Sequence, residues 1–156
     1  MLDKIDNCIA HLRSLEKATK KTIEDNSKKK GKETENVALS AKMDAFKEAA
    51  QAVIDLRLEV ELAPIIAKLG ETFDSAVAEI QRANIRGYRN QPWCCPVARY
   101  ISSQFEKFCI VVGEFVRIGD AKARLPKNVV SVVLRFDLGE IPELQALLKN
   151  QDERTS

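Results

Sequence analysis

The sequence contains few of the residues from which catalytic and metal sites are usually built. Its 156 residues include a single histidine, His11. This residue lies one position from the apolar stripe of a predicted helix, where a lone histidine is usually a surface residue. The sequence also has no glycine-rich phosphate loop, no nucleophile elbow and no His-Glu-x-x-His pattern. We therefore expect no catalytic residues, no cofactor and a protein that is not an enzyme.

Long apolar runs and a spaced set of cysteines are absent as well. The longest apolar stretches, such as 109–112, are far shorter than the roughly 20 residues of a membrane-spanning helix, so we expect no association with a membrane. The first residues, Met-Leu-Asp-Lys-Ile-Asp, lack the pattern of a secretory signal. The four cysteines, of which two are adjacent, do not form a disulfide framework. Together these features indicate a cytoplasmic protein.

The first half of the sequence has a strong helical pattern. Apolar residues recur at steps of three or four from Leu2 to Ile23, with charged and polar residues between them. This is typical of an amphipathic helix with the narrow seam of a coiled coil. A second such stripe runs from Leu39 to Val60, after a lysine-rich turn at 28–32. A short polar turn between two helices of matched length predicts a long antiparallel helical hairpin.

A third helix is expected after the hairpin. Pro64 interrupts the second stripe, so either a new helix begins there or the second helix bends. The apolar stripe continues to about Asn84, with Gly70 as a weak point. The hairpin and this helix together fill residues 1–85.

The second half has a different character and predicts a small α+β region at 86–150. Pro96 is placed to begin a short helix. Two segments, 108–112 and 115–118, are rich in β-branched and aromatic residues and are separated by Gly113. This pattern predicts one β-hairpin.

The segment 129–138 is open to two interpretations. Its residue types fit a buried strand, whereas its length and the preceding Pro126 fit a helix. Gly139 has the position of a helix C-cap, so the helix is preferred. Pro142 would then begin a last short helix.

These elements predict a mainly α (α+β) fold. The long antiparallel helical hairpin and the third helix are followed by the small α+β region with its one β-hairpin. Elements with separate apolar faces must bury them against one another. We therefore expect a single domain, 1–156, that ends in a flexible tail at 151–156.

The segment 86–99 is the best candidate for a binding site. It gathers arginine, tyrosine and tryptophan on a loop and at a helix N-terminus. Arginine recognises carboxylate or phosphate with several donors, and the aromatic residues supply contact area that binding removes from water. Exposed amide groups behind Pro96 would add affinity for anions. Alternatively, the tryptophan pins the loop to the core and the arginines are merely solvated. The candidate partner-binding residues are Arg86, Tyr88, Arg89, Trp93 and Arg99.

The adjacent Cys94 and Cys95 are possible reactive thiols. A reactive thiolate needs a lowered pKa, which neighbouring arginines and a helix N-terminus can provide. A zinc site needs three or four ligands, and the usual Cys-x-x-Cys pattern is absent, so no metal is expected. Buried structural cysteines are the preferred interpretation.

The leading hypothesis for function is a non-catalytic protein-interaction module, such as an accessory or regulatory adaptor subunit. Its basis is a helical hairpin scaffold, a loop rich in the residue types of interface hot spots, and no catalytic set. The apolar edge left over on the hairpin would pair with a second copy, which makes a homo-oligomer a further hypothesis.

The alternative hypothesis is a nucleic-acid-binding protein. Residues 86–135 contain nine lysines and arginines against three acidic residues, a net charge of +6. Trp93 or Tyr88 would stack on bases. The lysines at 28–32 would also neutralise phosphates, although ordinary turn chemistry is the preferred explanation for them. A lesser alternative is a thiol-based enzyme or sensor that works through the cysteine pair.

Overall fold

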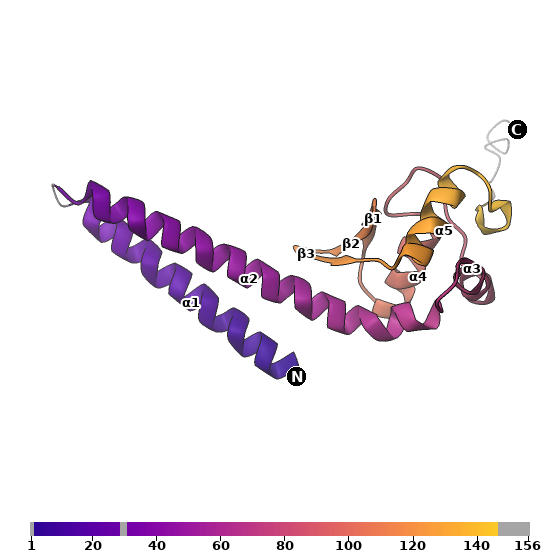
Figure 1. The fold of residues 1–156 in the computed structure, drawn as a ribbon, viewed down its shortest axis with the longest axis horizontal. Coiled ribbons are helices and arrows are strands. Elements are labelled where there is room, and N and C mark those ends of the chain that lie inside the picture. Colours follow the sequence, from indigo (N-terminus) through magenta and orange to yellow (C-terminus); the bar gives the residue numbers. More distant parts are fainter. Residues whose placement is uncertain (1, 29–30, 147–156) are drawn as a thin grey trace, which may run out of the picture. The chain divides into compact units, whose positions relative to one another are not determined.

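The computed structural model describes residues 2–28 and 31–146 (Figure 1). The chain consists of two compact units, Met1–Val60 and Glu61–Ser156. The first unit contains the helical hairpin, and the second contains the shorter helices and the sheet. The mainly α fold with a small β part is the one predicted from the sequence. The division falls inside a helix, so the predicted third helix belongs with the C-terminal elements.

The antiparallel hairpin is confirmed. It is formed by α1 (Leu2–Ser27) and the first part of α2 (Glu33–Lys68), which run side by side in Figure 1. Near the turn, Asn26 Nδ2 donates to Glu35 Oε1 at 3.1 Å. Near the open end, Arg57 forms an ion pair with Asp6. In each pair the two residues lie about equally far from the turn, as an antiparallel register requires.

No new helix begins at Pro64, the first of the two alternatives left open by the sequence. The second helix continues through Pro64 to Lys68, and α3 (Phe73–Arg82) begins only after a break. Gly70, two residues after the end of α2, has a left-handed φ of +74° and stops that helix from continuing. Thr72 then caps α3, because its side chain accepts the Ser75 N–H at 3.1 Å and the Ser75 hydroxyl accepts the Thr72 N–H in return. The apolar stripe carries across this break, which is why the sequence predicted one helix.

The preferred interpretation of 129–138 is confirmed, because this segment lies in the helix α5 (Lys127–Asp137). Its end is a Schellman motif. Gly139 has φ +82°, and its N–H donates to the Phe136 carbonyl at 2.9 Å. The predicted last short helix is a single 3₁₀ turn, Pro142–Leu144. Its expected continuation and the predicted tail at 151–156 lie outside the described residues.

The predicted β-hairpin is present, with one strand more. β1 (Ile110–Val112) and β2 (Phe115–Ile118) pair antiparallel around Gly113, which has φ +58°. β3 (Ala121–Arg124) pairs antiparallel with β2 and completes a sheet of order β1-β2-β3. The sequence pattern does not predict β3, because Ala-Lys-Ala-Arg contains no β-branched or aromatic residue.

The core of the second unit lies between its helices and one face of the sheet. α4 (Pro96–Phe105) contributes Tyr100, and α5 contributes Phe136; both are almost fully buried. The inward face of the sheet is formed by one residue from each strand. These residues are Val111, Val116 and Ala123.

Candidate functional site

The loop before α4 is held on two sides by backbone hydrogen bonds. Gly87 N–H donates to the Leu144 carbonyl, and Ala146 N–H donates to the Gly87 carbonyl, each at 2.8 Å. On the other side, Val111 N–H donates to the Pro92 carbonyl at 2.8 Å. The loop therefore joins the C-terminal segment to the edge of β1.

The structure gives two of the candidate arginines a role inside the fold. Arg99 Nη1 donates to the carbonyl of Arg86 at 2.6 Å, so it closes the loop onto α4. Arg89 Nη2 donates to Gln145 Oε1 at 2.8 Å. Its guanidinium also covers Gly139, since a Cβ added there would lie 2.5 Å from Arg89 Nη1. This positive charge stabilises the C-terminal end of α5, where carbonyl groups point outward.

The two candidate aromatic residues differ in exposure. Trp93 is 50% exposed, and Tyr88 is half-buried. Trp93 therefore does not bury its whole side chain against the core, and about half of the residue's surface faces solvent.

Asp137 is a site residue that the sequence did not suggest. Its Oδ1 accepts the backbone N–H of Asn90 at 2.8 Å, and Asn90 has a left-handed φ of 56°. The contact fastens the loop to the last turn of α5. No local sequence signal marks it, because the two residues are far apart in the chain.

A groove of about 280 Å³ lies where this loop, β1 and α5 meet. Its lining includes polar Asn90, Gln91 and Asp137. Two of its apolar residues are unusually exposed, Val112 at 51% and Leu134 at 56%. The apolar residues that line it are Pro92, Cys95, Val111, Val112, Val133 and Leu134.

A sequence signal for this groove exists on α5. Seven of the ten residues in 129–138 are apolar, more than one buried face of a helix can use. Val129, Val132 and Phe136 face the core, which leaves Leu134 and Leu138 exposed at 56% and 73%.

Cys95 caps α4. Its Sγ accepts the Ala98 N–H at 3.3 Å, and the residue is only 2% exposed. Burial raises the pKa of the Cys95 thiol to about 12, so at neutral pH it is almost entirely protonated. Cys94 is half-buried. The environment of Cys95 is therefore that of a buried structural cysteine.

The expected anion-binding amides at the start of α4 are not exposed. Cys95, Pro96, Val97 and Ala98 are all buried, and the Ala98 N–H is taken by the cysteine sulfur. The amides expected behind Pro96 are therefore not accessible to an anion, because the residues of this helix N-terminus are buried.

Metal ligands do not gather in the part of the chain that the structure describes. Within 2–28 and 31–146, no three side chains of histidine, cysteine, aspartate or glutamate are placed to hold an ion. His11 is exposed on α1, as its position in the helical pattern predicts.

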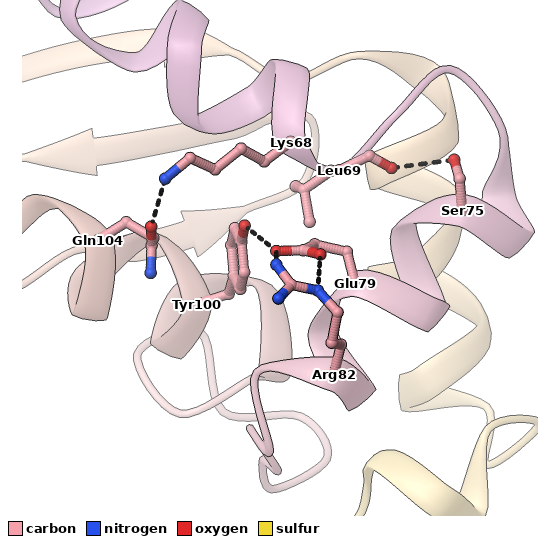
Figure 2. Close-up of polar contacts among 7 residues, drawn as sticks. All are labelled: Lys68, Leu69, Ser75, Glu79, Arg82, Tyr100 and Gln104. Carbon is pink, nitrogen blue, oxygen red and sulfur yellow. Dashed lines mark hydrogen bonds and ion pairs between the residues drawn. The ribbon is translucent and has the colours of Figure 1, made fainter.

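A polar cluster joins α3 and α4 (Figure 2). The Tyr100 hydroxyl donates to Glu79 Oε1 at 2.9 Å. Arg82 donates to both Glu79 oxygens, from Nε and from Nη2, at 2.8 Å. Tyr100 is fully buried, and burial, with the Glu79 hydrogen bond, raises its pKa to about 12. The cluster links α3 to α4 through hydrogen bonds. Because Tyr100 is buried, a substrate cannot reach its hydroxyl, and we assign the cluster a structural role.

Removing the Tyr100 hydroxyl is expected to weaken the link between α3 and α4 and to destabilise the protein. Tyr100→Phe should lower the free energy of unfolding by about 2 kcal/mol at pH 7, since hydrogen bonds to charged groups are worth about 1.5–3 kcal/mol. The Arg82 hydrogen bond lowers the pKa of Glu79, and Tyr100 adds to this effect. The stability from ionised Glu79 is therefore complete above about pH 4.5, its unfolded value, and is lost as pH falls through the lower folded value.

Urea unfolding at pH 7 and at acidic pH measures this effect. The difference between wild type and Tyr100→Phe should shrink in acid. Arg82→Ala is the control, because the Arg82 side chain is 76% exposed and solvent screens its ion pair with Glu79, so its loss should change stability less than Tyr100→Phe does. A pH-independent difference would show that the Glu79 carboxylate is not the acceptor.

No protein-family model, curated protein or solved structure matches this chain. Among the described residues, no helix is both long enough and apolar enough to cross a membrane. The function is therefore inferred from the residues of the chain itself.

Proposed function

We propose that this protein is a non-catalytic protein-interaction module whose second unit binds a protein partner through the groove beside the 86–99 loop. The observation that carries the proposal is the exposed apolar surface around one apolar groove. Val112 and Leu134 line it, and Trp93 directly follows Pro92 in its wall. Clustered apolar exposure of this kind is typical of interaction sites.

The size and composition of the groove suit a side chain of a protein better than a whole ligand molecule. Ligand pockets usually have about 300–1,000 Å³ and bury most of the ligand. The volume of about 280 Å³ lies just below that range. An apolar centre with a polar rim is the usual composition of a protein interface, and tryptophan is enriched among interface hot spots.

The hairpin is proposed as the scaffold of an adaptor. Its exposed apolar residues include Val37 at 71% and Leu56 at 51%. Pairing with a second copy through the hairpin is part of this proposal. We also propose a cytoplasmic location, which the four free cysteines support because thiols persist in a reducing compartment.

Placing a charge in the groove is expected to abolish partner binding. Leu134→Glu should weaken binding at least about tenfold, because the partner would have to desolvate a carboxylate against apolar walls. The melting temperature should hardly change, since Leu134 is exposed. Tagged wild type and variant serve as baits for extracts of the source cells, and captured proteins are quantified.

The matched control is Leu56→Glu, the same substitution at a similarly exposed leucine of the hairpin. A partner that Leu134→Glu loses and Leu56→Glu retains supports the groove. The opposite result would move the site to the hairpin. Light scattering of the same proteins reports self-association, which only the hairpin variant should reduce.

A further inference from the structure

The hairpin leaves most of its apolar seam partly exposed. Among the described residues of the first unit, the only apolar side chains that are buried are those of Ala50 and Leu58. The larger apolar residues of the α1 seam are only half-buried, although α1 and α2 run side by side. These residues are Ile5, Ile9, Leu12, Leu15 and Ile23.

A hairpin that buries so little needs a further covering for its seam. Most of the stability of helices in proteins comes from the packing of an apolar face and not from intrinsic helix propensity. A unit of about 60 residues is only marginally stable even when it has a compact core. Four helices around a shared core bury such seams. A second hairpin would supply the two helices that are needed.

The distribution of charge along the hairpin indicates which partner fits. The half next to the turn, 15–47, contains nine lysines against six acidic residues, a net charge of +3. The half at the open end, 1–14 with 48–60, contains three basic residues against five acidic ones, a net charge of −2. An ion pair within one half, such as Arg57 with Asp6, leaves the net charge of that half unchanged. The hairpin is therefore complementary in charge to a copy of itself that points the other way.

We propose that two copies of this chain pair antiparallel through their hairpins and form a four-helix bundle. The turn of each hairpin lies beside the open end of the other, so halves of opposite charge meet. A parallel pair would bring the two positive halves together. The antiparallel pair has two-fold symmetry, in which the same face of both copies forms the interface. This inference rests on the pairing with a second copy proposed above and adds its direction.

Distances between spin labels on the full chain test this direction. Ser14 and Ser27 are exposed residues at the middle and at the turn end of α1. Ser14→Cys and Ser27→Cys are labelled separately after Cys8→Ser/Cys94→Ser has removed the native thiols that are not buried. In the antiparallel pair the two Ser27 positions lie about 38 Å apart along the bundle, whereas the two Ser14 positions lie at the same level. Pulsed electron paramagnetic resonance should therefore give a much longer distance for the label at Ser27.

Charge reversal gives an independent test. Lys20→Glu/Lys21→Glu makes the half next to the turn negative and should weaken the pair about tenfold. Lys4→Glu/Arg13→Glu is the matched control. It changes the total charge by the same amount but makes the open end more negative, so it should strengthen the pair. All four residues are exposed. Analytical ultracentrifugation gives the dissociation constants, and circular dichroism confirms that each variant is folded.

The possible outcomes separate the direction of pairing from the pairing itself. Equally short distances for both labels, or the opposite order of the two charge variants, would overturn the antiparallel arrangement and leave pairing through the hairpin in place. A monomer at all concentrations would overturn both, and a different protein would then have to cover the seam. Neither result bears on the groove of the second unit, which Leu134→Glu tests.

Discussion

Replacing Phe136 by alanine is expected to destabilise the second unit by about 3–5 kcal/mol. Phe136 is 1% exposed and is among the largest fully buried side chains. Its removal loses the transfer energy of the ring and leaves a cavity that the surrounding helices cannot fill. Domains are stable by about 5–15 kcal/mol in total, so this is a large fraction of the reserve.

Unfolding in urea, followed by tryptophan fluorescence, measures this loss directly. The chain has one tryptophan, and Trp93 lies in the second unit, so the signal reports that unit alone. Leu138→Ala is the matched control, two residues further along and 73% exposed. It should change stability by less than about 0.5 kcal/mol. Equal losses in both variants would contradict the orientation of α5.

The local sequence pattern was sufficient to predict the helices whose buried face follows from the spacing of their own apolar residues. The hairpin seam from Leu2 to Val60 and the start of α4 at Pro96 are examples, because helix period and proline geometry act within a few residues. The break at Gly70 was underestimated. There the apolar stripe keeps its phase, while the left-handed glycine and the Thr72 cap end one helix and begin another. β3 is held by pairing with β2 and not by its own composition.

The candidate site was predictable only as a region. Residues of the loop at 86–99 do form one wall of the groove, and the exposed Trp93 follows the wall residue Pro92 in the sequence. The other walls come from β1 and α5, and no local pattern reports which segments meet. The sequence also could not show that Arg89 and Arg99 bind groups of their own fold, because those acceptors are Gln145 and a backbone carbonyl.

Gly87, the glycine of the 86–99 loop, is expected to tolerate no side chain without a shift of the backbone. A Cβ at Gly87 would lie 2.4 Å from the Cys94 carbonyl oxygen and 2.6 Å from Pro96 N. Both are backbone atoms and cannot rotate away, so the chain itself must shift. The Cys94 carbonyl also accepts the Tyr88 N–H at 2.9 Å, and the shift would weaken that bond. Gly87→Ala should therefore destabilise the second unit by about 3 kcal/mol.

Gly113→Ala is the control for the steric clash at Gly87, because it replaces a glycine at which an added Cβ meets no other atom. Gly113 has φ +58°, but nothing lies within 4 Å of an added Cβ. Its replacement should therefore lose only the left-handed preference, about 1 kcal/mol. Urea unfolding of both variants gives the comparison. If Gly87→Ala loses no more than Gly113→Ala, the loop yields easily. A yielding loop would be a poor wall for a preformed groove, and partner binding would then have to shape the groove itself.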